Sequence, residues 1–162
     1  MFNLQRIYSY INTMGGACMN MIDQSRNPSS TALLLFFCRY HVPLLSKLFR
    51  VLHNSDIYCN LKGREIHMPH PYGIIIHSKT IIGRNVTIMQ QVTLGGGRIG
   101  INEAPIIEDH VYIGAGAKVL GNVRIGHHAV IGANAVITRD VPAGATVVGA
   151  NRIIKTANEQ KP

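Results

Sequence analysis

Histidines and cysteines are the residues of this sequence with the widest choice of chemistry, and the chain has eight of the first and three of the second. An imidazole titrates near neutral pH, so a histidine can take the proton of a hydroxyl group that attacks a carbonyl carbon. The adjacent pair His127-His128 is not expected to chelate one metal ion, because neighbouring side chains point in different directions. We interpret the pair as outward-facing turn residues, and we expect acid–base chemistry without a metal.

Neither the cysteines nor the glycine run indicates another chemistry. Cys18, Cys38 and Cys59 have no CxxC or Cys/His ligand spacing, and we expect reduced thiols in a cytosolic protein. No cysteine has a matched base, so direct attack on a thioester is favoured over an acyl-enzyme. Gly95–Gly97 lacks the Lys-Ser/Thr ending and the strand–helix setting of a phosphate loop. It is better interpreted as a hinge into a loop.

The composition fits one domain with a small appendage. The chain has 162 residues, 46% of them hydrophobic, and no Trp, so Ile, Val, Leu and Ala must fill the core. A net charge of +8 favours anionic partners such as phosphate-bearing cofactors or an acidic membrane surface. The Lys and Arg residues are scattered and no nucleic-acid-binding motif is visible, so nucleic acid is not expected as a partner.

The pattern of the N-terminal region predicts neither a signal peptide nor a spanning segment. Residues 1–20 lack an apolar run that ends in a cleavage site. The apolar segment Thr31–Cys38 is far shorter than the roughly 20 residues that a spanning helix needs. We expect a cytoplasmic protein whose short, basic and apolar N-terminal region can sit at the inner membrane surface.

Residues 1–55 show helical spacing. Ser29 or Ser30 could cap a helix that begins near Thr31, and Pro43 would kink that helix or start a new one. Apolar residues then recur every three or four positions, which predicts an amphipathic helix to about His53. These residues are Leu44, Leu45, Leu48, Val51 and Leu52.

From about residue 57 the sequence repeats every six residues. A large aliphatic residue recurs at positions 76, 82, 88 and 94, and again at 107, 113, 119, 125, 131 and 137. A small or β-branched residue follows four positions later at most of these sites. The step from Leu94 to Ile107 exceeds two repeats by one residue. We interpret residues 95–106 as a loop extruded from the repeat, where function is common.

A period of six suits a solenoid in which each unit is one short strand and one turn. Three units make one triangular coil with the aliphatic residue inside. The fold class expected is mainly β, a parallel β-helix over about residues 57–148 with a short N-terminal helical region. The domains expected are 1–55, helical, and 56–162, the β-helix with its extruded loop. The period alone does not give the hand of the coil.

Longer stretches carry a resemblance to a known family. They are His70–Ile76, Val86–Gly96, Ile113–Asn122 and Val147–Asn151. Over about residues 54–156 the chain resembles the hexapeptide-repeat acyltransferases with a left-handed β-helix. Within that class it is similar to serine acetyltransferases and to acetyltransferases of capsule and exopolysaccharide synthesis. The resemblance implies acetyl transfer from acetyl-CoA to a hydroxyl group by a homotrimer with clefts between subunits.

The resemblance also implies roles for particular residues. His70, which opens an H-x-x-G stretch with Gly73, would be the catalytic base, and Asp56, about one coil earlier, would be its carboxylate partner. Tyr72 and Glu103 are expected at the acceptor. The residues expected to bind acetyl-CoA are Gly95 and Gly96 at the loop, Ala115, Gly116, Ala133 and Asn134 at repeat corners, and Arg139, Arg152 and Lys155 at the phosphates.

One departure from the family bears on the acceptor. Serine acetyltransferases have an Arg-His-Pro pattern at the end of the extruded loop, whereas this chain has Glu103-Ala104-Pro105. The loss of the Arg-His pair favours a sugar hydroxyl of a surface-polysaccharide precursor, with L-serine as the alternative. A solenoid without catalysis is the non-enzyme alternative, and His70 with Gly73 argues against it.

Overall fold

The computed structural model describes residues 36, 43–61, 64–97 and 103–155. Phe36 is helical, and helix α3 runs from Pro43 to Leu52. Proline is favoured at the start of a helix because its missing N–H would have no intrahelical partner there. The amphipathic helix predicted up to about His53 is confirmed. The predicted caps Ser29 and Ser30 lie outside the described residues, and the division of the chain at residue 55 stays a prediction.

The remaining elements are short strands of two to four residues separated by tight turns. They are β1 (Asp56–Ile57), β2 (Ile66–His67), β3 (Ile75–Ile76), β4 (Ile81–Ile82), β5 (Val86–Ile88), β6 (Thr93–Gly95), β7 (Ile106–Ile107), β8 (Tyr112–Ile113), β9 (Lys118–Leu120), β10 (Arg124–Ile125), β11 (Val130–Ile131), β12 (Val136–Ile137), β13 (Thr146–Val148) and β14 (Arg152–Lys155).

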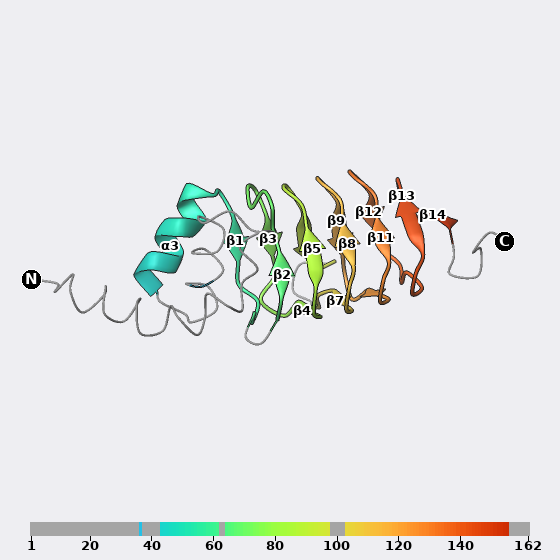
Figure 1. Ribbon diagram of the computed structural model, residues 1–162, viewed down its shortest axis with the longest axis horizontal. Helices are drawn as coiled ribbons and strands as arrows, with labels where there is room; N and C mark the ends of the chain where they lie inside the picture. The colour runs from blue at the N-terminus through green and yellow to red at the C-terminus, as the bar shows by residue number, and fades with distance from the viewer. Residues whose placement is uncertain (1–35, 37–42, 62–63, 98–102, 156–162) are drawn as a thin grey trace, which may run out of the picture.

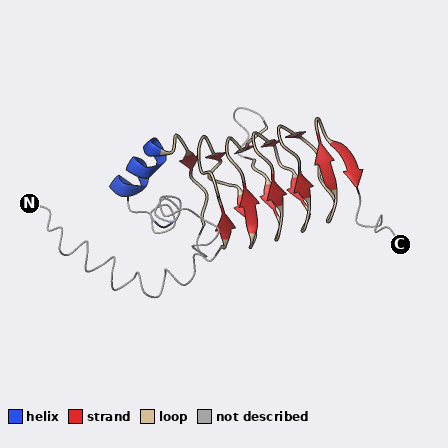
Figure 2. Ribbon diagram, turned by 45° about the horizontal axis from the view of Figure 1, so that its top comes forward, coloured by secondary structure: helices blue, strands red, loops and turns tan. Residues whose placement is uncertain are grey.

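These strands form three sheets along a solenoid (Figures 1 and 2). One sheet has the order β1-β3-β6-β9-β12, the second β2-β5-β8-β11-β13-β14, and the third β4-β7-β10. Neighbours within a sheet are parallel and belong to successive coils, except that β14 pairs antiparallel with β13. The fold is a left-handed parallel β-helix, as the family resemblance implies. The closing strand β14 was not predicted.

The six-residue repeat fills the interior of the coil. Every aliphatic residue of the predicted register, from Ile76 to Ile137, is buried. The described residues four positions later, such as Val92, Ala117 and Ala135, are buried as well. Strand residues between them point outward, because side chains alternate along a strand. The predicted core is therefore confirmed position by position.

The loop between Leu94 and Ile107 is a larger insertion than the sequence count suggested. Leu94 pairs with Val119 on the next coil, and Val119 pairs with Ile137 on the coil after that. The numbering shows that the first of these two steps is longer by seven residues, all of which belong to the loop. The interpretation of a one-residue excess was therefore wrong. The reason is that Ile107 fills the unit directly after Leu94, rather than the second unit.

Polar side chains connect successive coils on the outside. The Arg124 guanidinium donates to Glu108 Oε1 at 2.6 Å, and the His127 backbone N–H donates to Glu108 Oε2 at 2.8 Å. These two contacts lower the pKa of the Glu108 carboxyl.

Within the described ranges, no helix has the length and apolar character needed to cross a membrane.

Candidate active site

One corner of the solenoid holds the candidate site. It lies between the sheet that contains β2, which we call the β2 sheet, and the sheet that contains β1, which we call the β1 sheet. We call it the His70 corner and define it by one turn residue from each coil. All five have positive φ: Asn54 (47°), Gly73 (66°), Gln91 (59°), Gly116 (72°) and Asn134 (54°). Apart from Asn54, the backbone N–H of each of these residues donates a hydrogen bond to a carbonyl oxygen of the preceding coil. The Gln91 N–H, for example, donates to the Tyr72 carbonyl at 2.8 Å. The corner therefore forms a continuous edge along the axis.

The turn that carries His70 is longer than the equivalent turn of the next coil. Ile66 pairs with Val86, and Ile75 pairs with Thr93, so nine steps on one coil face seven on the next. Two extra residues thus lie between β2 and β3. His70 lies in this longer turn, and its side chain is exposed. A solvent-accessible imidazole at a protruding turn can meet a substrate.

A buried serine holds this turn in place. Ser55 lies between α3 and β1, and its hydroxyl contacts the Pro71 carbonyl at 2.6 Å and the His53 carbonyl at 3.1 Å. The same oxygen accepts a hydrogen bond from the Ile74 backbone N–H at 3.0 Å. Sequence reasoning missed Ser55, because Pro71 is 16 residues away and meets it only once the coils stack.

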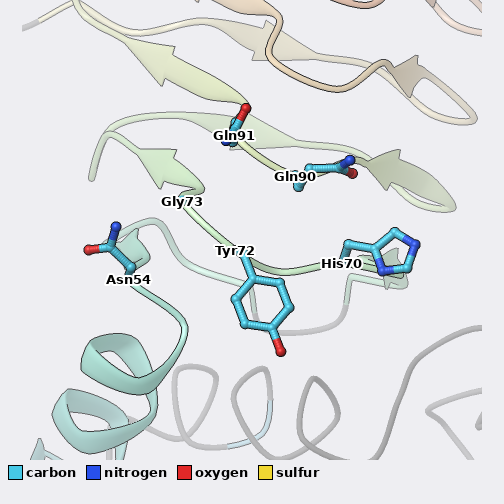
Figure 3. Close-up of a pocket in the computed structure, with 6 residues that line it drawn as sticks. All are labelled: Asn54, His70, Tyr72, Gly73, Gln90 and Gln91. Carbon is cyan, nitrogen blue, oxygen red and sulfur yellow. The ribbon is translucent and has the colours of Figure 1, made fainter.

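A pocket of about 440 Å³ opens at this corner (Figure 3). Its lining residues come from three successive coils, and they are Asn54, His70, Tyr72, Gly73, Gln90 and Gln91. The Tyr72 ring lies 5.4 Å from the buried His53 ring, centroid to centroid. Two residues predicted for the site, His70 and Tyr72, are therefore together. Asn54, Gln90 and Gln91 were not predicted, although Gln90-Gln91 stands in a stretch that carries the resemblance.

Asp56, the predicted partner of His70, does not line this pocket. It is exposed on β1, where its Oδ1 accepts a hydrogen bond from the Tyr58 hydroxyl at 3.3 Å. Its backbone N–H donates to the Ile74 carbonyl at 2.8 Å, which ties β1 to the end of the His70 turn. The role of Asp56 as carboxylate partner stays a prediction.

Seven of the nine residues predicted to bind acetyl-CoA lie at the two edges of the sheet that contains β1, and Arg152 and Lys155 lie on β14 of another sheet. Ala115, Gly116, Ala133 and Asn134 continue the His70 corner along the axis. A Cβ at Gly116 would overlap the Asn134 side chain, so this corner stays flat at Gly116. Gly95 and Gly96 lie at the other edge, where β6 ends, and Arg139 follows β12 at that edge.

The remaining predicted residues, Arg152, Lys155 and Glu103, do not line the pocket. Arg152 is exposed on β14, and Lys155 ends that strand. Glu103 is exposed, whereas the following Ala104 and Pro105 are buried. Residues 98–102 of the predicted loop lie outside the described part.

The paired histidines lie at a different corner. His127 and His128 are exposed, and the His128 ring stacks on His110 with centroids 4.7 Å apart. Among the described residues, no three His, Cys, Asp or Glu side chains come together in a group that could hold a metal ion.

The repeat and the fold together define a hexapeptide-repeat protein of the left-handed β-helix class. A family described as "Bacterial transferase hexapeptide (six repeats)" matches residues 104–139. A serine acetyltransferase of Synechococcus elongatus is 44% identical over 108 residues, which are 65% of this chain and 44% of that protein. A serine acetyltransferase of Helicobacter pylori is also 44% identical over 108 residues, 65% of this chain and 63% of that protein.

Solved structures of serine acetyltransferases are also similar to this chain. Soybean serine acetyltransferase complexed with serine has a TM-score of 0.54 and 34% identity, and the match covers 75% of this chain and 53% of that one. A serine acetyltransferase in complex with CoA has a TM-score of 0.52 and 30% identity, covering 75% and 52%. Over its repeat region the chain is similar to serine acetyltransferases, and it spans about half the length of most of these relatives.

Proposed function

We propose that this protein transfers the acetyl group of acetyl-CoA to the hydroxyl of a small acceptor, with His70 as general base. The observation that carries the proposal is the exposed imidazole on a turn two residues longer than its neighbour, at the mouth of the pocket. Its neutral form takes the hydroxyl proton while the acceptor oxygen attacks the thioester carbonyl. Backbone N–H groups or a loop donor would meet the negative charge on that carbonyl oxygen.

No acyl-enzyme is part of this proposal. The described cysteine, Cys59, is buried in the coil and cannot reach a substrate. In the proposed mechanism both substrates are bound together, so the kinetics should be sequential. Asp56 would orient the imidazole. Its backbone contact with the His70 turn supports a position close to the base.

Acetyl-CoA is the proposed donor, with no metal required. Small residues along the His70 corner, from Ala115 to Asn134, would let the pantetheine arm run close to the backbone. Gly95 and Gly96 would support the loop that covers this arm. Arg139, Arg152 and Lys155 are the candidates for the CoA phosphates. A solved serine acetyltransferase similar to this chain holds CoA, which supports the choice of donor.

L-Serine is the acceptor that the comparisons favour. The relatives described above are serine acetyltransferases, and one of the similar structures holds serine. A sugar hydroxyl is the second candidate, and a specific observation favours it. Ala104 stands where serine acetyltransferases have the histidine of their Arg-His pair, and it is buried and apolar. Tyr72 and Glu103 would meet the acceptor in either case.

The active assembly proposed is a homotrimer. Large apolar side chains remain exposed on the outer faces of the single solenoid. The exposed fractions of Ile75, Ile81 and Tyr112 are 49%, 51% and 39%. Three solenoids packed side by side would cover such faces and form equivalent clefts. Contact of the N-terminal region with a membrane surface is a further part of the proposal. It is supported by the exposed Leu48, Val51 and Leu52 of α3.

Thiol release from acetyl-CoA tests the proposal directly. The assay is run with L-serine and, in parallel, with a UDP-hexose, and the acetylated product is identified by mass spectrometry. Acceptor-dependent release with either compound supports acetyl transfer, and the faster acceptor is assigned. If neither compound stimulates thiol release above the rate of hydrolysis, the proposed function is wrong. Activity lost with EDTA and restored by zinc would contradict the metal-free mechanism.

A further inference from the structure

Gln90 carries an unusual feature for a residue at a repeat corner. It follows β5 and lines the pocket. Its side-chain oxygen Oε1 is buried, and no described group donates a hydrogen bond to it. A buried polar atom left unpaired is energetically costly, so such atoms usually have a partner. The described residues of the free protein do not supply that partner, and Gln90 lines a pocket that can hold one.

The solenoid itself does not require an amide at this place. The Gln90 carbonyl accepts from Gly116, and the Ala115 carbonyl in turn accepts from Asn134, so residues 90, 115 and 133 are equivalent in successive coils. The two later coils have Ala115 and Ala133. A methyl group is thus sufficient for packing and turn formation. Among these equivalent positions, glutamine appears only where the pocket lies.

The amide also lies on the same side of the corner as the proposed base. Figure 3 shows the Gln90 side chain and the His70 side chain both extending to the right of Tyr72. The Gln90 backbone is fixed, since its carbonyl accepts from the Gly116 N–H at 2.9 Å. A small molecule whose hydroxyl meets His70 would present its neighbouring groups to this amide.

We propose that Gln90 is a specificity residue that recognises a second hydrogen-bond donor of the acceptor. Its Oε1 accepts from an ammonium or hydroxyl group of the acceptor, while His70 takes the proton of the reacting hydroxyl. The inference rests on the proposed acetyl transfer. A site with a buried acceptor rejects analogues that lack the matching donor, because the acceptor atom then stays unpaired. Simple monofunctional alcohols should therefore be poor substrates.

Gln90→Met tests this inference, because methionine has a similar length and no hydrogen-bonding amide. Kinetics are measured with L-serine and with 3-hydroxypropanoate, which has the same hydroxyl and carboxylate but no ammonium group. If the acceptor is a sugar, the pair is that sugar and its deoxy analogue. We expect kcat/KM for the full acceptor to fall about 10- to 100-fold. The KM for acetyl-CoA should not change, and the variant and wild type should use the analogue within about twofold of each other.

Thermal melting separates recognition from a structural role. Without substrates, Gln90→Met should melt at the same temperature as wild type or higher, since it removes an unpaired buried oxygen. The upward shift that L-serine gives to wild type should shrink in the variant. Ser78→Ala, in an exposed turn at the opposite edge of the sheet, is the control and should match wild type in both measurements.

The possible failures are distinguishable. If wild type releases no thiol with any acceptor, the proposed function is overturned. If wild type is active and Gln90→Met keeps its kcat/KM for the full acceptor, acetyl transfer stands and the inference about Gln90 is overturned. A lower melting temperature for Gln90→Met without substrates, or dissociation of its assembly, assigns the amide to structure and also overturns the inference.

Discussion

At the scale of single residues, the candidate site depends on side chains that fix a turn as much as on the imidazole. His70 could be found from the sequence, because it stands in a motif whose pattern is local. Ser55 and Gln90 could not, since their importance arises from contacts between coils. Ser55 is buried and connects the α3–β1 junction to both Pro71 and Ile74. The turn that carries the proposed base is therefore held by a residue that no local motif identifies.

We expect Ser55→Ala to impair both stability and activity. It leaves the Ile74 N–H and the Pro71 carbonyl without their partner, which should cost about 1–3 kcal/mol in the free energy of unfolding. A loosened His70 turn should lower kcat about 10-fold or more, with the KM for acetyl-CoA unchanged. Urea denaturation and steady-state kinetics provide the measurements. Ser55→Thr, which keeps the hydroxyl, should recover most of kcat, and failure of this recovery would argue against a positioning role.

Thr80 offers a test of the core at the same scale. It occupies the buried position filled by Val86 and Val92 in the next units, and its hydroxyl has no partner among the described residues. Thr80→Val keeps the shape and removes an unpaired polar group. The free energy of unfolding should rise by about 1 kcal/mol. Val92→Thr is the matched reverse change and should lower it. A loss of stability in Thr80→Val would show that the hydroxyl has a partner.

At the scale of elements, the repeat was the most informative part of the sequence. Each six-residue unit forms its own strand and turn, so the register from Ile107 to Ile137 could be predicted without knowing the fold. The extra residues were harder to place. The excess of seven residues after Leu94 and of two residues around His70 became clear only from strand pairing. Insertions interrupt a period, and a period alone does not say which coil gains them.

Close stacking of the coils predicts a strict requirement for glycine at one turn. A Cβ at Gly114 would lie 2.7 Å from the Ala133 backbone nitrogen and 2.9 Å from the Ile131 carbonyl oxygen. Gly114→Ala should therefore lower the free energy of unfolding by about 1–3 kcal/mol, the usual cost of overpacking. At Gly95 the nearest atom to a Cβ is 3.5 Å away, so Gly95→Ala is the control. Equal melting temperatures for the two variants would contradict the stacking described here.

At the scale of the whole molecule, a single solenoid leaves apolar side chains on its outer faces. A chain of 17.8 kDa with exposed Ile75, Ile81 and Val136 should associate. We expect a trimer, three chains of 17.8 kDa or about 53 kDa, by light scattering at micromolar concentration. Ile81→Glu should weaken it if that face is buried between subunits. A wild-type monomer would contradict the trimer and the clefts proposed between subunits.

The central claim is that His70 is the general base of acetyl transfer, and its replacement tests this most directly. The measurement is kcat for thiol release by His70→Ala with the best acceptor, together with CoA binding by calorimetry. His127→Ala, in an exposed turn at another corner, is the control. We predict that His70→Ala loses at least about 100-fold in kcat and still binds CoA, because removal of a general base costs about 10²- to 10⁴-fold. A His70→Ala enzyme that keeps more than half of the wild-type kcat would contradict the account.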